Sequence, residues 1–140
     1  MLTLRRHSNA IDKFPDGDYL LSARHTDALY KISHLDGSIL WRLGGVDSDF
    51  ELIGDAKFSR QHHARVRDQN ETHVLISLFD NAEGTGAEEL PDRTESRGLV
   101  LALSTEHMTA EIVAEYRHPR GDMTNSRGKV LKSVVGSMEF

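Results

Sequence analysis

Two Asp-Gly turns separate short apolar segments in the first third of this 140-residue chain, and they strongly constrain its fold. The first turn, Asp16-Gly17, follows a proline; proline presets one backbone dihedral angle, and glycine tolerates a positive φ. The second turn is Asp36-Gly37. The segments around the turns are too short for helices, and their pattern favours strands over residues 11–14, 18–24, 28–33 and 39–43. We therefore predict a four-stranded antiparallel meander.

The same order of hairpin, break and hairpin returns later in the chain. Strands are predicted over residues 63–67, 73–79, 97–104 and 110–116. The connection at residues 46–61 is less regular, and we interpret it as a surface crossover with three apolar anchors, Phe50, Leu52 and Phe58. A long polar insertion at residues 81–96 interrupts the second meander, and insertions within repeats often lie on the binding face.

Repeated four-stranded meanders of this size are typical of the blades of a β-propeller. We predict an all-β fold in which residues 1–140 form one partial propeller domain. Its parts are a first blade at 7–45, the crossover at 46–61, a second blade at 62–118 and the start of a third, truncated blade at 119–140. A twisted four-stranded sandwich is the alternative. Each blade needs neighbours to bury its faces, so exposed blade edges are expected to favour self-association.

Composition excludes several classes of function. The chain is 38% hydrophobic and 28% charged, as expected of a globular protein, and its net charge of −5 argues against binding nucleic acid. It has no cysteine, so disulfides and thiolate chemistry are excluded. Neither a signal peptide nor an apolar run long enough to span a bilayer is present, and we assign no location to the full-length parent, which could be a secreted protein.

Histidine and arginine residues recur at the ends of the predicted strands. His7 and His62 each precede the first strand of a meander. Arg24 ends the second strand of the first meander with His25 at the same edge, and Asn81 lies at the end of the second strand of the second meander. If the meanders are blades, these positions meet at one mouth of the central channel. Neutral imidazole is a nucleophile and a general base, and arginine presents a forked array of donors to a sulfate or phosphate group. The cluster therefore suits transfer of an anionic tetrahedral group.

Other interpretations of these residues stay open. His62 and His63 would point to opposite faces of a regular strand, so the pair is not a metal motif. His7, His25 and His62 could supply metal ligands, but their spacing is not diagnostic, and we predict no metal or other cofactor. We assign surface roles to the remaining histidines, His34, His73, His107 and His118. Trp41 and Tyr30 are expected in the core in preference to stacking on a substrate ring.

Several strings, in order, resemble the arylsulfotransferase family, in particular its fungal branch. They are HSNAID, DGDYLLSARHTDALYKI, DGSILWRLGG, FSRQHHARV, ISLFDN and SRGLVLAL, and they cover roughly residues 7 to 118. The resemblance implies a six-bladed β-propeller. It also implies transfer of a sulfuryl group from an aryl sulfate to a phenolic acceptor, through a sulfated histidine in the bacterial members.

Carried over by position, the resemblance makes His62 the nucleophile and gives His7 and Arg24 the role of holding the sulfuryl oxygens. His25, His63 and Asn81 are expected to bind substrate, and His63 is a rival nucleophile. Family members are several times longer than this chain and contribute a further active-site histidine from other blades. We therefore expect the isolated chain to be inactive. A rival hypothesis is a non-catalytic propeller scaffold that binds a partner through the insertion or its blade edges; a histidine-cluster metal hydrolase is a third.

Overall fold

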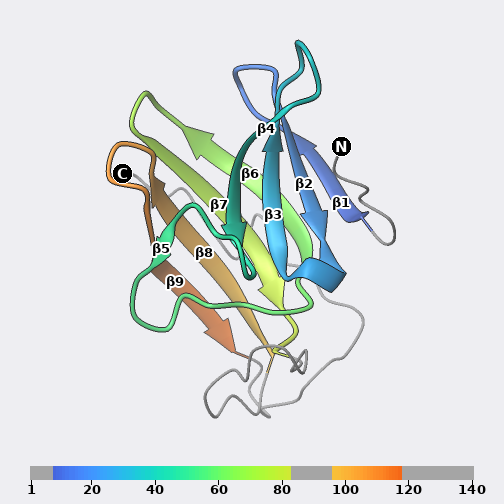
Figure 1. The fold of residues 1–140 in the computed structure, drawn as a ribbon. Helices are drawn as coiled ribbons and strands as arrows, with labels where there is room; N and C mark the ends of the chain where they lie inside the picture. Colours follow the sequence, from blue (N-terminus) through green and yellow to red (C-terminus); the bar gives the residue numbers. More distant parts are fainter. Residues whose placement is uncertain (1–7, 83–95, 118–140) are drawn as a thin grey trace.

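The computed structural model describes residues 8–82 and 96–117, which form two antiparallel β-sheets (Figure 1). His7, most of the insertion and the start of the predicted third blade lie outside the described residues. The described part contains no helix that is long and apolar enough to cross a membrane. The prediction of an all-β fold built from four-stranded antiparallel meanders is confirmed.

The first sheet contains four strands in chain order, each hydrogen-bonded to the next. They are β1 (Ser8–Lys13), β2 (Tyr19–Ala23), β3 (Ala28–Ile32) and β4 (Ile39–Gly44). One 3₁₀ turn, η1 (Arg24–Thr26), connects β2 to β3. The predicted Asp-Gly turns are present, since Gly17 N–H donates to Phe14 O over 2.9 Å, and Gly17 has a φ of 97°.

The second sheet repeats the meander and adds one short strand. Its antiparallel strands are β6 (His62–Gln69), β7 (His73–Asp80), β8 (Arg97–Ser104) and β9 (Thr109–Arg117). Strand β5 (Glu51–Leu52) pairs in parallel with β9 at the far edge, so the order is β5-β9-β8-β7-β6. The sequence pattern did not predict β5, because two residues show no periodicity.

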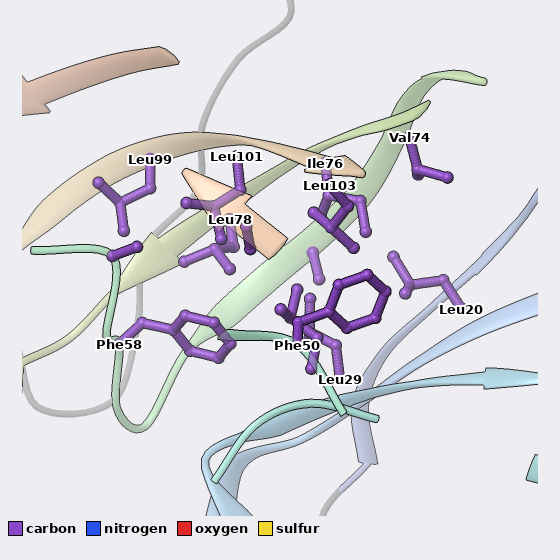
Figure 2. Close-up of a cluster of buried hydrophobic side chains, with 14 of the residues drawn as sticks. Leu20, Leu29, Phe50, Phe58, Val74, Ile76, Leu78, Leu99, Leu101 and Leu103 are labelled. Atoms are coloured by element: carbon purple, nitrogen blue, oxygen red, sulfur yellow. The ribbon is translucent and has the colours of Figure 1, made fainter. Parts of the chain in front are cut away.

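Alternating side chains of the strands form the core between the sheets (Figure 2). In β8, Leu99, Leu101 and Leu103 point into this core, whereas Val100 belongs to a separate cluster on the other face. Such alternation follows from the two-residue period of a strand. Trp41 packs edge-to-face against the rings of Phe14 and Phe50, at centroid distances of 5.9 and 5.2 Å.

The two sheets meet along their first strands. β1 lies against β6, and the Asp12 carboxylate accepts a hydrogen bond from Val66 N–H at 2.8 Å. Adjacent first strands are compatible with neighbouring blades of a propeller.

Two of the three apolar anchors predicted for the crossover are buried. Phe50 and Phe58 are each only 3% exposed, and Ala56 is fully buried, whereas most other residues of the segment are exposed. The buried side chains cover the inner faces of both sheets, because burial of apolar surface is favourable. The expected core positions of Trp41 and Tyr30 are confirmed, although Tyr30 packs on the outer face of the first sheet.

Candidate functional site

The predicted site residues within the described ranges gather at one end of the two sheets. His62 opens β6, Asn81 follows β7, and Arg24 and His25 lie in η1 directly after β2. This is the end at which β2, β4, β7 and β9 terminate (Figure 1). His7 lies outside the described residues.

A short contact orients the ring of His62. Its Nδ1 lies 2.7 Å from Asn81 Oδ1, and Asn81 is fully buried at the exit of β7. An amide oxygen only accepts hydrogen bonds, so His62 must carry a proton on Nδ1 to make this bond. In the neutral ring, Nε2 then bears the lone pair, which is the form that a nucleophile requires.

The η1 turn lies beside the start of β6. Ala23, which precedes Arg24, accepts a hydrogen bond through its carbonyl from the side chain of Gln61, which precedes His62. Further along, Arg60 N–H donates to the Asp27 carboxylate at 2.7 Å. The segment that carries Arg24 is therefore tied to the segment that carries the candidate nucleophile.

His25 is exposed, and its ring contacts Arg60. The Arg60 guanidinium donates to His25 Nδ1 over 3.0 Å. Because a guanidinium has no acceptor, His25 Nδ1 must be unprotonated in this contact. Sequence reasoning placed His25 at this edge but did not single out Arg60, which brings a second guanidinium to the end of the sheets where Arg24 lies.

Two glycines let the η1 turn pack closely on the end of β4. A Cβ on Gly44 would lie 2.7 Å from the Phe58 ring and 2.8 Å from Asp27 O, and one on Gly45 would lie 2.5 Å from Thr26 O. Both residues also have positive φ, of 82° and 69°. Glycine is therefore required at both positions for the turn to reach its observed place.

His63 departs from regular strand geometry. Its φ is 52°, and the register between β6 and β7 shifts between His62 and Arg65, as in a β-bulge. The expectation that neighbouring rings point to opposite faces assumed regular alternation, so it does not apply here. Bulges re-aim side chains, and this one directly follows the residue with the Asn81 contact.

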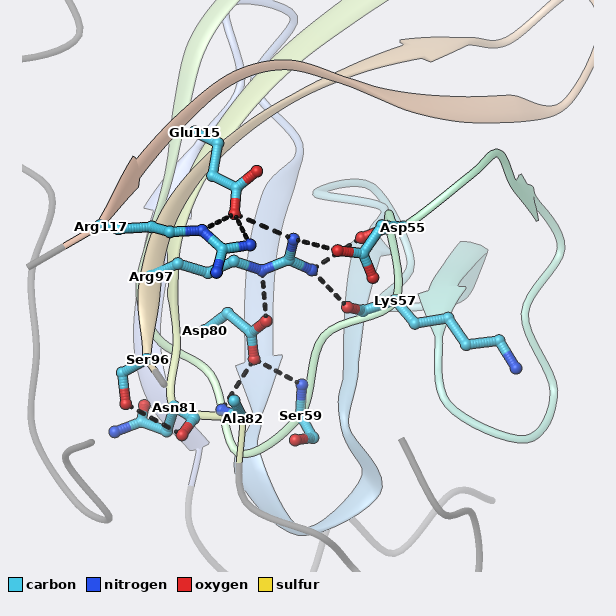
Figure 3. Close-up of polar contacts among 10 residues, drawn as sticks. All are labelled: Asp55, Lys57, Ser59, Asp80, Asn81, Ala82, Ser96, Arg97, Glu115 and Arg117. Atoms are coloured by element: carbon cyan, nitrogen blue, oxygen red, sulfur yellow. Dashed lines mark hydrogen bonds and ion pairs between the residues drawn. The ribbon is translucent and has the colours of Figure 1, made fainter. Parts of the chain in front are cut away.

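A buried ion pair involves Asp80, the residue directly before Asn81 (Figure 3). Arg97 Nε donates to the Asp80 carboxylate at 3.0 Å, and neither side chain has exposed surface. The other Asp80 oxygen accepts from Ser59 N–H at 3.0 Å and Ala82 N–H at 2.9 Å. Burial raises the pKa of Asp80 above its ordinary value, while the bonds from Ser59 and Arg97 oppose this rise.

The Arg97 guanidinium also joins the crossover to the second sheet. It donates to the carboxylate and carbonyl of Asp55, at 2.9 and 2.7 Å, and to Lys57 O at 3.0 Å. Glu115 on β9 completes its partners, 3.4 Å away. These contacts fix the segment that leads into His62 relative to the strand end that carries Asn81.

Sequence reasoning missed Gln61, Arg60 and Arg97 as parts of this end of the molecule. A signal existed for Arg97: it is a charged residue at the start of a very apolar strand, opposite Asp80 in register. Gln61 gave no signal, since its role depends on a contact between sheets. In the described ranges, no group of three or more histidine, aspartate or glutamate side chains is placed to hold a metal ion.

Comparison with known proteins identifies the family of this chain independently of the structure. The model of a family described as arylsulfotransferase (ASST) matches residues 5–134, which is most of the chain and includes both described sheets. No curated protein matches the chain. The match agrees with the family resemblance inferred from the ordered strings around His62, Arg24 and Asn81. The chain therefore belongs to the arylsulfotransferase (ASST) family.

Proposed function

We propose that this chain carries a site that moves a sulfuryl group from an aryl sulfate to a phenolic acceptor, with His62 as the nucleophile. Membership of the family supports a sulfotransferase-like function. The observation that carries the residue assignment is the 2.7 Å contact between His62 Nδ1 and Asn81 Oδ1. It holds the proton on Nδ1 and leaves the Nε2 lone pair for attack, which favours His62 over His63.

The proposed reaction has two displacements at sulfur. The Nε2 lone pair of His62 attacks the sulfur, a nitrogen–sulfur bond forms, and the aryl oxygen leaves with the electrons of the broken sulfur–oxygen bond and takes a proton from solvent. The phenolic acceptor then attacks the same sulfur and loses its proton. The nitrogen–sulfur bond breaks, and its electron pair returns to Nε2.

Charge moves onto the ring during the first displacement. Because Nδ1 keeps its proton, the imidazole ring that carries the sulfonate is cationic, and the Asn81 carbonyl oxygen can stabilise it through the existing hydrogen bond. We propose Asn81 as a positioning residue, which is a different role from the substrate contact predicted from sequence. Arg24 and His7 are proposed to hold the sulfuryl oxygens, and His25 and His63 to line the substrate site.

The test is direct trapping of the sulfated histidine. The chain is incubated with 4-nitrophenyl sulfate, release of nitrophenol is followed, and the modified residue is located by mass spectrometry. We expect one sulfuryl group on His62 without sustained turnover. His62→Ala should lose the modification. His107→Ala should keep it, since that side chain is 75% exposed at the opposite end of the sheets.

Modification of a different residue, or equal nitrophenol release from the His62→Ala and His107→Ala variants, would contradict the assignment of the nucleophile. No modification of the unsubstituted chain would favour the rival hypothesis of a non-catalytic propeller scaffold. That scaffold would bind through residues 81–96 or through its blade edges, which are also the proposed route of self-association. Light scattering on the same sample measures such self-association.

A further inference from the structure

Gln61 is fully buried between the two sheets, immediately before His62. Its Nε2 lies 3.1 Å from Ser22 Oγ, 3.3 Å from Ala23 O and 3.0 Å from Ala28 O. Two of these three atoms are main-chain carbonyls, which only accept hydrogen bonds, so the amide nitrogen must face them. The orientation of the side chain is therefore fixed by its surroundings.

The two carbonyls bracket the turn that carries Arg24. Ala23 is the last residue of β2, and Ala28 is the first residue of β3, with η1 between them. A single side chain thus closes the base of this turn and ties it to the start of β6. From within the turn, Thr26 Oγ1 also donates to Ala23 O, at 3.2 Å.

The main chain of Gln61 makes a second link to the first sheet. Its carbonyl accepts a hydrogen bond from Asn9 Nδ2 at 2.7 Å, and Asn9 lies in β1. Gln61 is therefore bonded to β1 through its backbone and to the β2–β3 connection through its side chain. The position of His62, one residue further along, is set against both parts of the first sheet.

We infer that Gln61 is a positioning residue that holds the nucleophile His62 at a fixed separation from the Arg24 turn. The inference rests on the proposed function, in which His62 and Arg24 act on the same sulfuryl group. Gln61 is buried and does not need to touch substrate. It acts by preventing the two sheets from shifting relative to each other at the end where the chemistry takes place.

The experiment is a double-mutant cycle on the rate at which His62 is sulfated by 4-nitrophenyl sulfate. Gln61→Met keeps the length of the side chain and removes its donors. If Gln61 aligns Arg24, this substitution should slow sulfation about tenfold in the unsubstituted chain and less than about twofold in an Arg24→Gln background. The loss of thermal stability should be equal in both backgrounds. Gln69→Met, at the other end of β6, is the matched control and should leave the rate unchanged.

A slowing by the same factor in both backgrounds would show a merely structural role and overturn the inference, as would an unchanged rate. If Gln61→Met does not fold, Ser22→Ala replaces it in the cycle, because it removes one of the three acceptors and leaves both carbonyl contacts. The non-additivity expected of Ser22→Ala is smaller but has the same sign, and additive rates for it overturn the inference.

A second measurement does not depend on catalysis. Hydrogen exchange of the Asp27 amide, which donates to Arg24 O at 3.3 Å, reports on closure of η1. Faster exchange in Gln61→Met than in Gln69→Met supports the inference, and equal exchange overturns it. If the unsubstituted chain is never sulfated, the proposed function fails, and this exchange comparison alone decides whether Gln61 closes the turn.

Discussion

Asn81 Oδ1 lies 2.7 Å from His62 Nδ1, so the residue that follows β7 orients the ring at the start of β6. His62 is paired in register with Phe79, two residues before Asn81. The contact therefore joins two neighbouring strands of one sheet. In the proposed reaction this contact leaves Nε2 of His62 for attack on sulfur, and Gln61 holds the start of β6 against the other sheet.

Replacing Asn81 with leucine should release the His62 ring from a single tautomer. The hydrogen bond is worth on the order of 1.4 kcal/mol, so sulfation of His62 is expected to slow about tenfold. Long-range ¹H–¹⁵N spectra of the ring measure the tautomer directly. Asn81→Asp keeps an acceptor oxygen and should retain the proton on Nδ1. An unchanged tautomer in Asn81→Leu would contradict the proposed role of Asn81.

Removing one partner of the buried ion pair should strongly destabilise the fold. Arg97→Met leaves the Asp80 carboxylate buried without its guanidinium, and we expect a loss of roughly 3–5 kcal/mol in the free energy of unfolding. Urea denaturation measures it. The double variant Asp80→Leu/Arg97→Met should recover part of the loss, because no uncompensated charge remains. Arg42→Met, on the half-buried middle of β4, is the control and should cost much less.

Alanine substitutions at Gly44 and Gly37, compared with each other, test how closely η1 packs on the end of β4. Both have positive φ, of 82° and 74°, so alanine at either position should cost about 1–2 kcal/mol through backbone strain. Only Gly44 has neighbours in the way, namely Phe58 and Asp27 O. Gly44→Ala should therefore cost about 1–3 kcal/mol more than Gly37→Ala. Equal losses in thermal denaturation would argue against close packing of the turn.

The crossover should contribute to stability as a core element. Phe50→Ala removes a ring that is 3% exposed and is expected to lower the free energy of unfolding by about 3–5 kcal/mol. Val46→Ala is the control from the same segment, since Val46 is 79% exposed and should change stability by less than about 0.5 kcal/mol. Similar values for the two variants would contradict the role of Phe50 as an anchor of the crossover.

Acid should lower the free energy of unfolding through Asp16. This residue lies in the turn between β1 and β2, at the end of the sheets opposite the candidate site. Desolvation acts to raise the pKa of Asp16, but the hydrogen bond from Lys31 and further hydrogen bonds lower it from 3.8 to about 2. A depressed folded-state pKa adds stability above the unfolded value. That stability is lost as the pH falls from 3.8 towards about 2.

Urea denaturation across this pH window tests the prediction. Asp16→Asn should flatten the fall in stability, because the variant has no carboxyl to protonate at this position. Asp47→Asn, at an exposed position, should leave the fall unchanged and serves as the control. A slope that is the same in both variants would exclude Asp16 as its source. The pKa of Asp18 is also lowered, by hydrogen bonds from His34, so some slope should persist in Asp16→Asn.

Local patterns in the sequence were sufficient to predict the two meanders. Turn residues such as Asp16-Gly17 specify their own backbone conformation, and alternation such as that of Leu99 to Leu103 specifies which face of a strand is buried. Both signals act over a few residues. The same locality placed His62 and Asn81 at corresponding strand ends, because antiparallel neighbours bring the start of one strand beside the end of the next.

The burial of Ala56 and the bulge could not be predicted in this way. Ala56 is buried because the two sheets close over it, and nothing in the spacing of residues 46–61 records that. The left-handed backbone of His63 belongs to a register shift between β6 and β7, which depends on how the two strands pair.

By itself, then, the sequence determined the two meanders, the turns, the family and the candidate nucleophile His62, since each depends on residue types in short strings. Only the tertiary structure decided that Asn81 contacts Nδ1 of His62, that Arg97 is a buried ion-pair partner of Asp80, and that Gln61 ties the Arg24 turn to the start of β6. These three relationships depend on distances across strands and sheets. Such distances are set by packing and hydrogen bonding of the whole fold, and no local pattern encodes them.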